Sequence, residues 1–217
     1  MYGIKLFVLG FFNTNTYVVY NEHTLDGIIV DPGSYSKDLI EWIKSMGLNI
    51  VAIIATHGHF DHLEGVDKLR DELDAEFLIH RDDLEILDYN YDLARQFNID
   101  YRKVEPDKVI DREGYHRFKS IEIYILHTPG HTPGSITIYI PSISSLLTGD
   151  TLFSGSVGTT ELPGGCEEDL LKSLCKIYSL YPLETIVLPG HGPKTTLDKE
   201  YRANLFVINA LNSCRYR

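Results

Sequence analysis

Apolar and polar positions along the chain follow two different periods. Short runs rich in Val and Ile, bounded by Gly, Pro, Asn or Asp, are typical of buried β-strands. Longer stretches with apolar residues three or four positions apart are typical of amphipathic helices. The pattern predicts strands near residues 4–9, 16–20, 27–31, 51–55, 76–79, 121–126, 135–140, 144–148 and 185–188. It predicts helices near residues 36–46, 60–73, 81–87, 167–180 and 198–211.

The order of these elements predicts the fold class. Two clusters of strands, each accompanied by helices, favour an α/β fold in which two sheets pack face to face with helices outside. The chain has 217 residues, and we expect residues 1–217 to form a single domain around a substantial core. We find no clear internal repeat and no low-complexity linker that would divide it.

Candidate chemistry is concentrated directly after the apolar run at residues 50–55. Four metal-binding side chains stand within the six residues of the sequence HGHFDH, at positions 57–62. Imidazole and carboxylate suit Zn, Fe or Mn. In extended backbone His57 and His59 point to the same side, while Asp61 and His62 at the helix start can face a neighbouring position. One segment can thus serve two adjacent metals, although a polar turn with Asp61 as helix cap is the plainer alternative.

Three further segments also follow apolar runs and contain turn residues. They carry His131, Asp150 and His191, the two histidines in loops rich in Gly and Pro. Such loops can bring ligands close to an ion, and groups at strand ends often form sites. Taken singly, each residue is more ordinary as part of a surface turn or a cap. Together with residues 57–62 they indicate one site.

In order and context these segments resemble the metallo-β-lactamase superfamily, and most closely its glyoxalase II-like hydrolases. The resemblance covers about residues 6–206. Besides positions 57–62 it includes the segments Ile28-Ile29-Val30-Asp31-Pro32-Gly33, Gly130-His131-Thr132-Pro133-Gly134, Thr148-Gly149-Asp150-Thr151-Leu152-Phe153, Gly155-Ser156-Val157-Gly158, Leu162-Pro163-Gly164-Gly165 and Pro189-Gly190-His191-Gly192-Pro193. It implies a four-layer α/β/β/α sandwich.

Position by position, the resemblance implies two sets of ligands and a bridge: His57, His59 and His131 for the first metal, Asp61, His62 and His191 for the second, and Asp150 between them. Two divalent ions are expected as cofactors, with zinc preferred and iron or manganese as alternatives. Asp31 matches a position close to the site in this family, although Asp31-Pro32-Gly33 also fits a simple strand-ending turn.

The other histidines are expected outside the centre. His23 and His116 lie in polar or charged stretches and are interpreted as surface residues. His80 follows a strand and is expected to cap the next helix, and His127 is interpreted as structural.

The implied chemistry is hydrolysis. Paired ions lower the pKa of bound water, so that a metal-bound hydroxide can attack a carbonyl while the second ion stabilises the oxyanion. We name Asp61 and Asp150 as catalytic, since Asp61 can also orient the nucleophile or accept its proton. A thiolate leaves readily because the pKa of a thiol is about 8.5. The motifs contain no further marked general acid, which favours a thioester such as a hydroxyacylglutathione.

Two departures weaken the expectation of glutathione recognition. Longer glyoxalase II-like proteins have a C-terminal helical domain that helps to bind glutathione, whereas this chain ends soon after one terminal helix. Thr159 stands where related sequences commonly carry Arg. Neither departure bears on metal-dependent hydrolysis.

Alternative functions remain open at this point. A persulfide dioxygenase on the same scaffold would use one iron held by His57, His131 and Asp150, with open positions for oxygen. A metallohydrolase acting on another ester or a phosphoester would use the paired site. A metal-stabilised binding module is disfavoured, because a structural site needs no open coordination position.

Composition narrows the range of partners. The formal net charge of −11 argues against nucleic-acid binding and favours a small-molecule substrate, which can be an anionic thioester drawn to the metals. No apolar run is long enough for a membrane span. The apolar stretch at residues 4–12 lacks a basic start and a cleavage site, so we expect a cytoplasmic protein of undetermined oligomeric state.

Two smaller expectations concern the cysteines and a polar segment. The three cysteines are odd in number and widely spaced, which suggests neither a disulfide scaffold nor a thiolate metal site. Cys175 is interpreted as a buried, inert residue. The polar segment at residues 82–119 is expected to cover one wall of the cleft, and a surface connection with its tyrosines half buried against the core is the plainer alternative.

Overall fold

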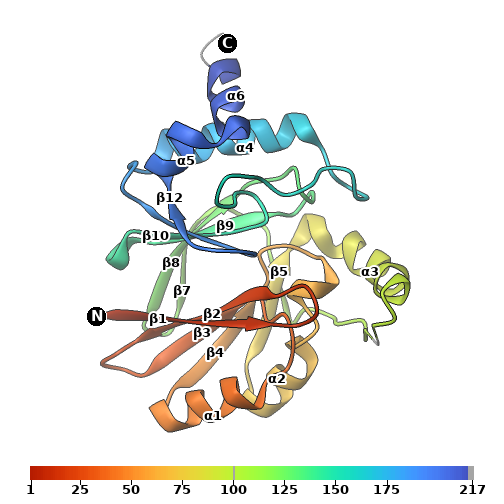
Figure 1. Cartoon of the computed structure of the whole chain (residues 1–217). Coiled ribbons are helices and arrows are strands. Elements are labelled where there is room, and N and C mark those ends of the chain that lie inside the picture. Colours follow the sequence, from red (N-terminus) through yellow and green to blue (C-terminus); the bar gives the residue numbers. More distant parts are fainter. Residues whose placement is uncertain (100, 215–217) are drawn as a thin grey trace.

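Two six-stranded sheets face each other in this computed structural model, which describes residues 1–99 and 101–214 (Figure 1). The first sheet contains, in spatial order, β1 (Tyr2–Leu9), β2 (Thr14–Asn21), β3 (Asp26–Val30), β4 (Asn49–Ile54), β5 (Glu76–His80) and β6 (Lys108–Ile110). The second contains β12 (Thr195–Thr196), β11 (Ile186–Pro189), β10 (Ser145–Gly149), β9 (Ile136–Ile140), β8 (Ile121–His127) and β7 (Gly114–Phe118).

The main core lies between the sheets. Alternate side chains of a strand point to opposite faces, and in β8 the residues Ile121, Ile123 and Ile125 are buried on the inner face. Ile28 and Ile54 of the first sheet belong to the same cluster. The alternation that predicted these strands therefore also selects which side chains fill the space between the sheets.

Helices cover both outer faces (Figure 1). On the first sheet lie α1 (Lys37–Met46), α2 (Val66–Leu73) and α3 (Leu84–Gln96), and on the second lie α4 (Glu167–Leu180), α5 (Leu197–Ala203) and α6 (Leu205–Cys214). Leu39 and Leu69 pack on the first sheet, and Leu174 and Val207 on the second. The predicted four-layer α/β/β/α sandwich is confirmed.

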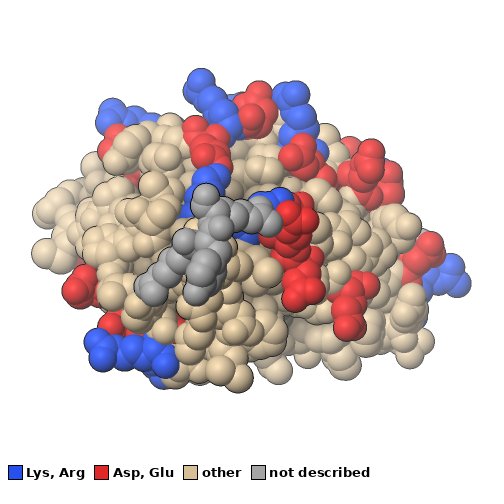
Figure 2. Space-filling model, turned by 90° about the horizontal axis from the view of Figure 1, so that it is seen from above, with Lys and Arg blue, Asp and Glu red and all other residues tan. Residues whose placement is uncertain are grey.

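Figure 2 views the outer face above the second sheet, where acidic and basic side chains are interspersed. Several form ion pairs along the helices. Lys172 on α4 contacts Glu168 at 3.1 Å, and Arg202 on α5 contacts Asp198 at 2.9 Å. This face is therefore a mixed, solvated surface.

Among the described residues, no helix has the length and apolar character needed to cross a bilayer.

Three predicted helices differ from the observed ones. Residues 60–73 form a 3-10 turn at Phe60–His62 and then α2, because the chain bends where the Gly65 amide donates to the Pro32 carbonyl at 2.9 Å. Residues 81–87 begin with a 3-10 turn, Arg81–Asp83, and continue as the longer α3. The predicted terminal helix is divided into α5 and α6. The short strands β6, β7 and β12 were not predicted, since segments of two to five residues carry little periodicity.

The cysteine prediction is wrong for two of the three residues. Cys175 on α4 and Cys214 on α6 form a disulfide with Cα atoms 6.4 Å apart, while Cys166 is free. Spacing along the chain cannot reveal this pair, because it depends on how α6 packs against α4.

The topology brings loops from both sheets to one edge of the sandwich. Strands β3, β4 and β5 are mutually parallel, and so are β10 and β11. The loops that leave the carboxyl ends of such strands gather on one side, where α/β proteins bind ligands. An isolated bridge between Thr14 and His191 joins the two sheets at this edge.

Candidate metal centre

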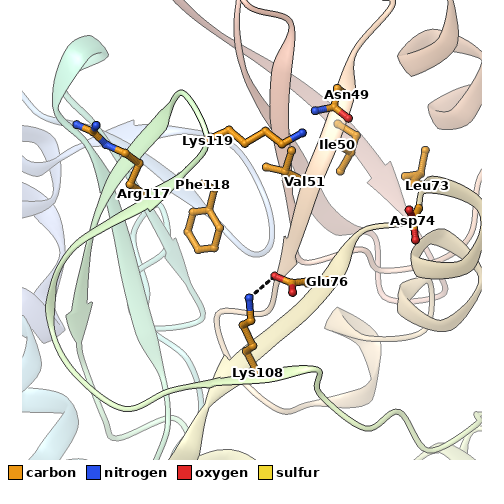
Figure 3. Close-up of a pocket in the computed structure, with 10 residues that line it drawn as sticks. All are labelled: Asn49, Ile50, Val51, Leu73, Asp74, Glu76, Lys108, Arg117, Phe118 and Lys119. Carbon is orange, nitrogen blue, oxygen red and sulfur yellow. Dashed lines mark hydrogen bonds and ion pairs between the residues drawn. The ribbon is translucent and has the colours of Figure 1, made fainter.

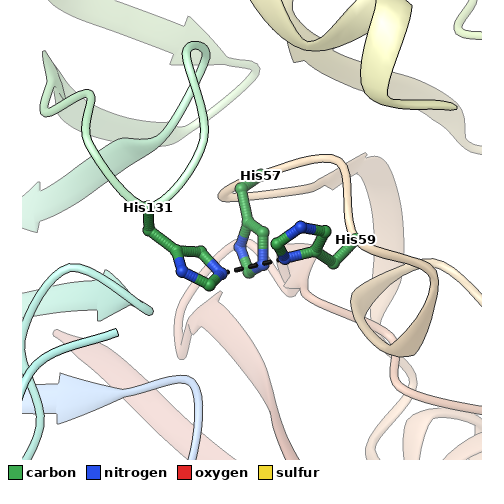
Figure 4. Close-up of side chains that lie close together, drawn as sticks. All are labelled: His57, His59 and His131. Carbon is green, nitrogen blue, oxygen red and sulfur yellow. Dashed lines mark hydrogen bonds between the residues drawn. The ribbon is translucent and has the colours of Figure 1, made fainter. Parts of the chain in front are cut away.

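Three histidines from two loops form the first half of the site. His57 and His59 follow β4, and His131 follows β8; their rings point toward one another (Figure 4). Their ligand atoms all lie within 4.8 Å of one another, and His59 Nδ1 is 2.9 Å from His131 Nε2. Nitrogens bound to one tetrahedral zinc at ~2.0–2.1 Å stand roughly 3.3 Å apart. The spacing therefore suits a single ion.

The second half contains Asp61, His62 and His191, which also lie within 4.8 Å of one another. His62 Nε2 is 3.2 Å from His191 Nε2, and His191 Nε2 is 3.2 Å from Asp61 Oδ2. Asp61 and His62 belong to the 3-10 turn, whereas His191 follows β11. The turn brings both side chains toward His191 on the opposite loop, while the His62 ring also lies 4.1 Å from the ring of His57.

Asp150 lies between the two halves. Its Oδ2 is 3.6 Å from Nε2 of both His131 and His191, and its Oδ1 is 3.4 Å from His62 Nε2. One carboxylate thus faces both sets, which is the position required of a bridging ligand. The structure brings all seven predicted residues together, while their role as ligands stays a prediction.

The donor set fits a pair of divalent cations. His57 Nε2 and Asp150 Oδ1 are buried without a hydrogen-bond partner among the described residues. An unsatisfied buried polar atom costs about 1–3 kcal/mol, and two such atoms pointing into a ring of imidazoles call for a shared partner. Imidazole with carboxylate is the donor set of zinc and iron sites.

Outer contacts fix the orientation of three imidazoles. The Nδ1 atom of His131 donates to the Thr159 carbonyl at 2.7 Å, and that of His191 to the Phe12 carbonyl at 3.1 Å. His62 Nδ1 faces Asp31 Oδ2 at 3.1 Å. Each contact leaves Nε2 free for a metal, in the arrangement usual for histidine ligands. Thr159 therefore contributes to the centre through its backbone.

Asp31 supports the site from behind. Its carboxylate accepts from the Thr56 amide and from the Thr56 hydroxyl, both at 2.7 Å, besides contacting His62. It adopts a φ of 52°, a strained conformation for a residue with a side chain. The contacts favour the position implied by the family resemblance over a simple turn.

Asp83 has a comparable role that the sequence did not reveal. It is fully buried, and its carboxylate accepts from the Gly58 amide at 2.7 Å, the Thr132 hydroxyl at 2.7 Å and the Gly134 amide at 2.5 Å. It thereby joins the loop of His57 to the loop of His131. The one available signal was its position after β5, beside the metal-binding loop of β4.

The two halves of the centre differ in electrostatics. Burial lowers the pKa of His57 well below its usual value and lowers that of His59 to about 3. Burial also opposes protonation of His62, but Asp31, Asp150 and Asp61 outweigh it and raise the pKa of His62 well above its usual value. Burial therefore favours the neutral form of His57 and His59, whereas the second half couples the His62 imidazole to carboxylates.

A glycine allows the loops to approach. A Cβ on Gly190 would collide with Asp150 Oδ1 and would lie 2.8 Å from His62 Cε1. Only a residue without a side chain fits between these two groups.

A cavity of about 310 Å³ opens over the centre. Its lining includes predicted ligands of both halves together with several apolar side chains: Phe12, His59, Phe60, Asp61, Leu93, Phe97, His131, Asp150, Thr159, Leu162 and His191. Leu93 and Phe97 come from the polar segment at residues 82–119, so the expectation that this segment covers a wall of the cleft is confirmed.

The other histidines lie outside the seven-residue centre. His80 accepts a hydrogen bond from the Asp82 amide at 3.3 Å and caps the following 3-10 turn, and His127 faces the Pro133 carbonyl at 2.8 Å, so both have structural roles. His23 and His116 are not among the described groups of residues that could hold a metal.

Comparisons with known proteins agree with this geometry. The family described as the metallo-beta-lactamase superfamily matches residues 9–191. A hydroxyacylglutathione hydrolase, GloC of Haemophilus influenzae, is 31% identical over 94% of this chain and 98% of its own length.

Two solved structures are also similar. The BLEG-1 B3 metallo-beta-lactamase is 35% identical with a TM-score of 0.88, and the match covers 94% of this chain and 99% of that protein. TTHA1623, in a di-iron-bound form, is 37% identical with a TM-score of 0.83, over 93% of this chain and 99% of that protein.

Proposed function

The chain belongs to the metallo-beta-lactamase superfamily and is a metallohydrolase, and from this premise we propose that it hydrolyses thioesters in the manner of glyoxalase II. The observation that carries the proposal is the convergence of six predicted ligands on two sides of Asp150. The similarity to GloC, described as a hydroxyacylglutathione hydrolase, supports the thioester class.

The residues that would hold the ions are those of the two halves, with Asp150 shared. When bound, two divalent cations supply Lewis-acid chemistry, which lowers the pKa of water and polarises a carbonyl. We propose zinc as the usual metal, and iron is supported by the di-iron form of TTHA1623. Asp61, 17% exposed in its side chain and facing the cavity, is positioned to orient the attacking water or accept its proton.

The cavity chemistry supports a thiol as the leaving group. In hydrolysis the water oxygen bonds to the carbonyl carbon, the carbon–sulfur bond breaks, and the sulfur takes a proton from water. The described residues that line the cavity are five of the predicted ligands (His59, Asp61, His131, Asp150 and His191), Thr159 and apolar residues, so the lining offers no separate general acid. An amine leaving group needs an acid beside it, whereas a thiolate with a pKa near ~8.5 needs little help.

The alternatives are weaker on geometry. A single-iron persulfide dioxygenase would need only His57, His131 and Asp150, and would leave the convergence of Asp61, His62 and His191 without a purpose. The similarity to BLEG-1 raises β-lactam hydrolysis as a further reaction of the same scaffold, and it is included in the test below.

The test combines metal counting with a substrate panel. Purified protein is expected to contain two metal ions per chain by elemental analysis and to release thiol from S-D-lactoylglutathione and from other thioesters, without oxygen uptake in the presence of a persulfide. One iron with oxygen uptake would favour the dioxygenase. Cleavage of a chromogenic cephalosporin, with no thioester cleavage, would replace the proposal by β-lactam hydrolysis.

A further inference from the structure

One wall of the cavity over the metal centre is apolar and largely aromatic. Phe12 comes from the turn between β1 and β2, Phe60 from the 3-10 turn beside the ligands, and Phe97 from the end of α3. Leu93 and Leu162 complete this wall. On the basis of the proposed thioesterase function, we infer that the natural substrate carries an apolar acyl group, which lies against these five side chains.

The wall is built by ring packing. The ring centroid of Phe12 lies 5.0 Å from that of Phe97 and 5.8 Å from that of Phe60, both with edge-to-face geometry. Phe60 is 2% exposed and anchors the group to the core. Such pairs hold a fixed apolar surface, which favours binding of an apolar group over a hydrated one.

No lysine or arginine is among the described residues that line this cavity. A carboxylate buried there would lose water without gaining an ion pair, which is unfavourable. Thr159 and Leu162, which lie close together in the sequence, add a hydroxyl and an apolar side chain to this lining but no charge. Anionic groups of a glutathione conjugate would therefore find no charged side chain on this wall.

Basic side chains do line a separate, larger cavity of about 520 Å³, shown in Figure 3. It contains Lys108, Arg117 and Lys119, but it opens beside Asn49 and Glu76, where β4 and β5 begin. The metal-binding loop leaves the other end of β4, roughly 20 Å away for a strand of this length. These cations cannot reach a substrate at the metal centre.

The acyl group, and not the thiol, is the part of the substrate that we expect to contact this wall. In hydrolysis, water adds its oxygen to the acyl carbonyl, the carbon–sulfur bond breaks, and the thiol departs with a proton. The acyl chain is attached directly to the carbon under attack and stays beside the ligands in the acid product. The cavity is at the small end of the usual range for ligand pockets, ~300–1,000 Å³, and suits a chain or ring of modest size.

The test is a chain-length series. N-acetylcysteamine thioesters of acetate, butanoate and hexanoate share one leaving group, and S-D-lactoylglutathione provides a polar acyl group on an anionic thiol. With the metal-loaded protein we expect kcat/KM to rise about tenfold from acetyl to hexanoyl, as for burial of roughly two of the four added methylene groups. The hexanoyl value should also exceed that for lactoylglutathione.

Two phenylalanine variants, one inside the wall and one outside the cavity, test whether the wall causes this preference. Phe97→Ala should reduce the hexanoyl-to-acetyl ratio of kcat/KM at least threefold, because it removes apolar surface from the wall. Phe97 is 42% exposed, so we expect the fold to tolerate its loss. Phe206→Ala, at an exposed phenylalanine on α6 outside this cavity, should keep the full ratio. Calorimetry with the products gives a second readout: hexanoate should bind more tightly than acetate, and less so in Phe97→Ala.

The outcomes separate the two proposals. A flat series, or a preference for lactoylglutathione, overturns the apolar acyl group and leaves thioester hydrolysis standing. If no thioester is cleaved, the proposed function fails. Calorimetry then decides the inference: binding of hexanoate that depends on Phe97 supports the apolar wall as a subsite, and equal binding of acetate and hexanoate overturns it.

Discussion

Two groups of histidine and aspartate side chains lie at the same edge of the sandwich. The seven-residue centre is one, and the smaller cluster of His80, Asp82 and His127 is the other. The possible ligand atoms lie within 4.8 Å of one another in each triad of the centre, and the same holds for the smaller cluster. Residue type and distance alone therefore do not distinguish them.

Ring orientation separates the two groups. In the centre the rings of His57, His59 and His131 meet at 79–89°, so that their nitrogens converge. The rings of His80 and His127 are stacked, 4.2 Å apart at an interplanar angle of 14°. An ion must lie near the plane of each imidazole that binds it, and two stacked planes do not meet at one point. The comparison shows that the direction of the lone pairs decides which group can hold a metal.

Replacing one aspartate in each group by alanine gives the strongest test of this comparison. Asp150→Ala should lower metal content below two ions per chain and reduce turnover at least ~100-fold, since one carboxylate serves both halves. Asp82→Ala, in the stacked cluster, should keep both ions and normal turnover. Elemental analysis and thioester assays measure both effects. Full metal content with a normal rate in Asp150→Ala would rule out the bridge.

Asp83 joins the loop of His57 to the loop of His131 through hydrogen bonds. Removing its carboxylate tests whether the positions of the predicted ligands depend on these bonds. Asp83→Ala leaves the Gly58 and Gly134 amides without their acceptor. We expect a loss of about 3 kcal/mol in the free energy of unfolding and a ~10–100-fold loss in metal affinity. Urea unfolding and competition with a chelator measure these quantities. Asp83→Asn, which keeps one acceptor oxygen, should be intermediate; unchanged affinity in both variants would contradict the role.

A substitution of Asp31, which contacts His62, tests whether the two halves of the centre can be weakened separately. Asp31→Asn keeps the shape of the side chain but weakens its interaction with His62 and with the Thr56 hydroxyl. The expected result is a loss of ~10-fold in affinity for one of the two ions, with the other retained. Metal titration followed by calorimetry resolves two steps, and equal weakening of both steps would show that Asp31 supports the whole centre.

The stacked cluster should give the smallest effect. His80→Gln should leave two ions per chain, which elemental analysis measures; loss of an ion would mean that the stacked cluster does contribute ligands.

The same variant has a small effect on stability that depends on pH. Burial, reinforced by His127 and Arg81 and opposed by Asp82 and Asp111, lowers the pKa of His80 below 6.5. The unfolded chain therefore takes up this proton first, and the stability that depends on neutral His80 is present above pH ~6.5 and falls on acidification. Urea unfolding at pH 7.5 and 5.5 should show the wild type losing stability relative to His80→Gln.

The sequence predicted much of the scaffold and the composition of the centre. The apolar runs anticipated nine of the strands, and the clustering at residues 57–62 pointed to a metal site because its four ligand side chains are nearly adjacent. It did not predict the break before α2 or the short strands. These depend on contacts such as that between Gly65 and Pro32, which join distant parts of the chain.

What the sequence determined by itself was therefore the kind of chemistry: imidazole and carboxylate groups at the ends of buried strands. Tertiary structure alone decided that Asp83 ties two loops together, that His80 and His127 stack instead of converging, and that Phe12 and Phe97 meet in one wall. The physical reason is that ligand identity is a property of single residues, whereas direction, support and enclosure depend on backbones brought together from distant positions.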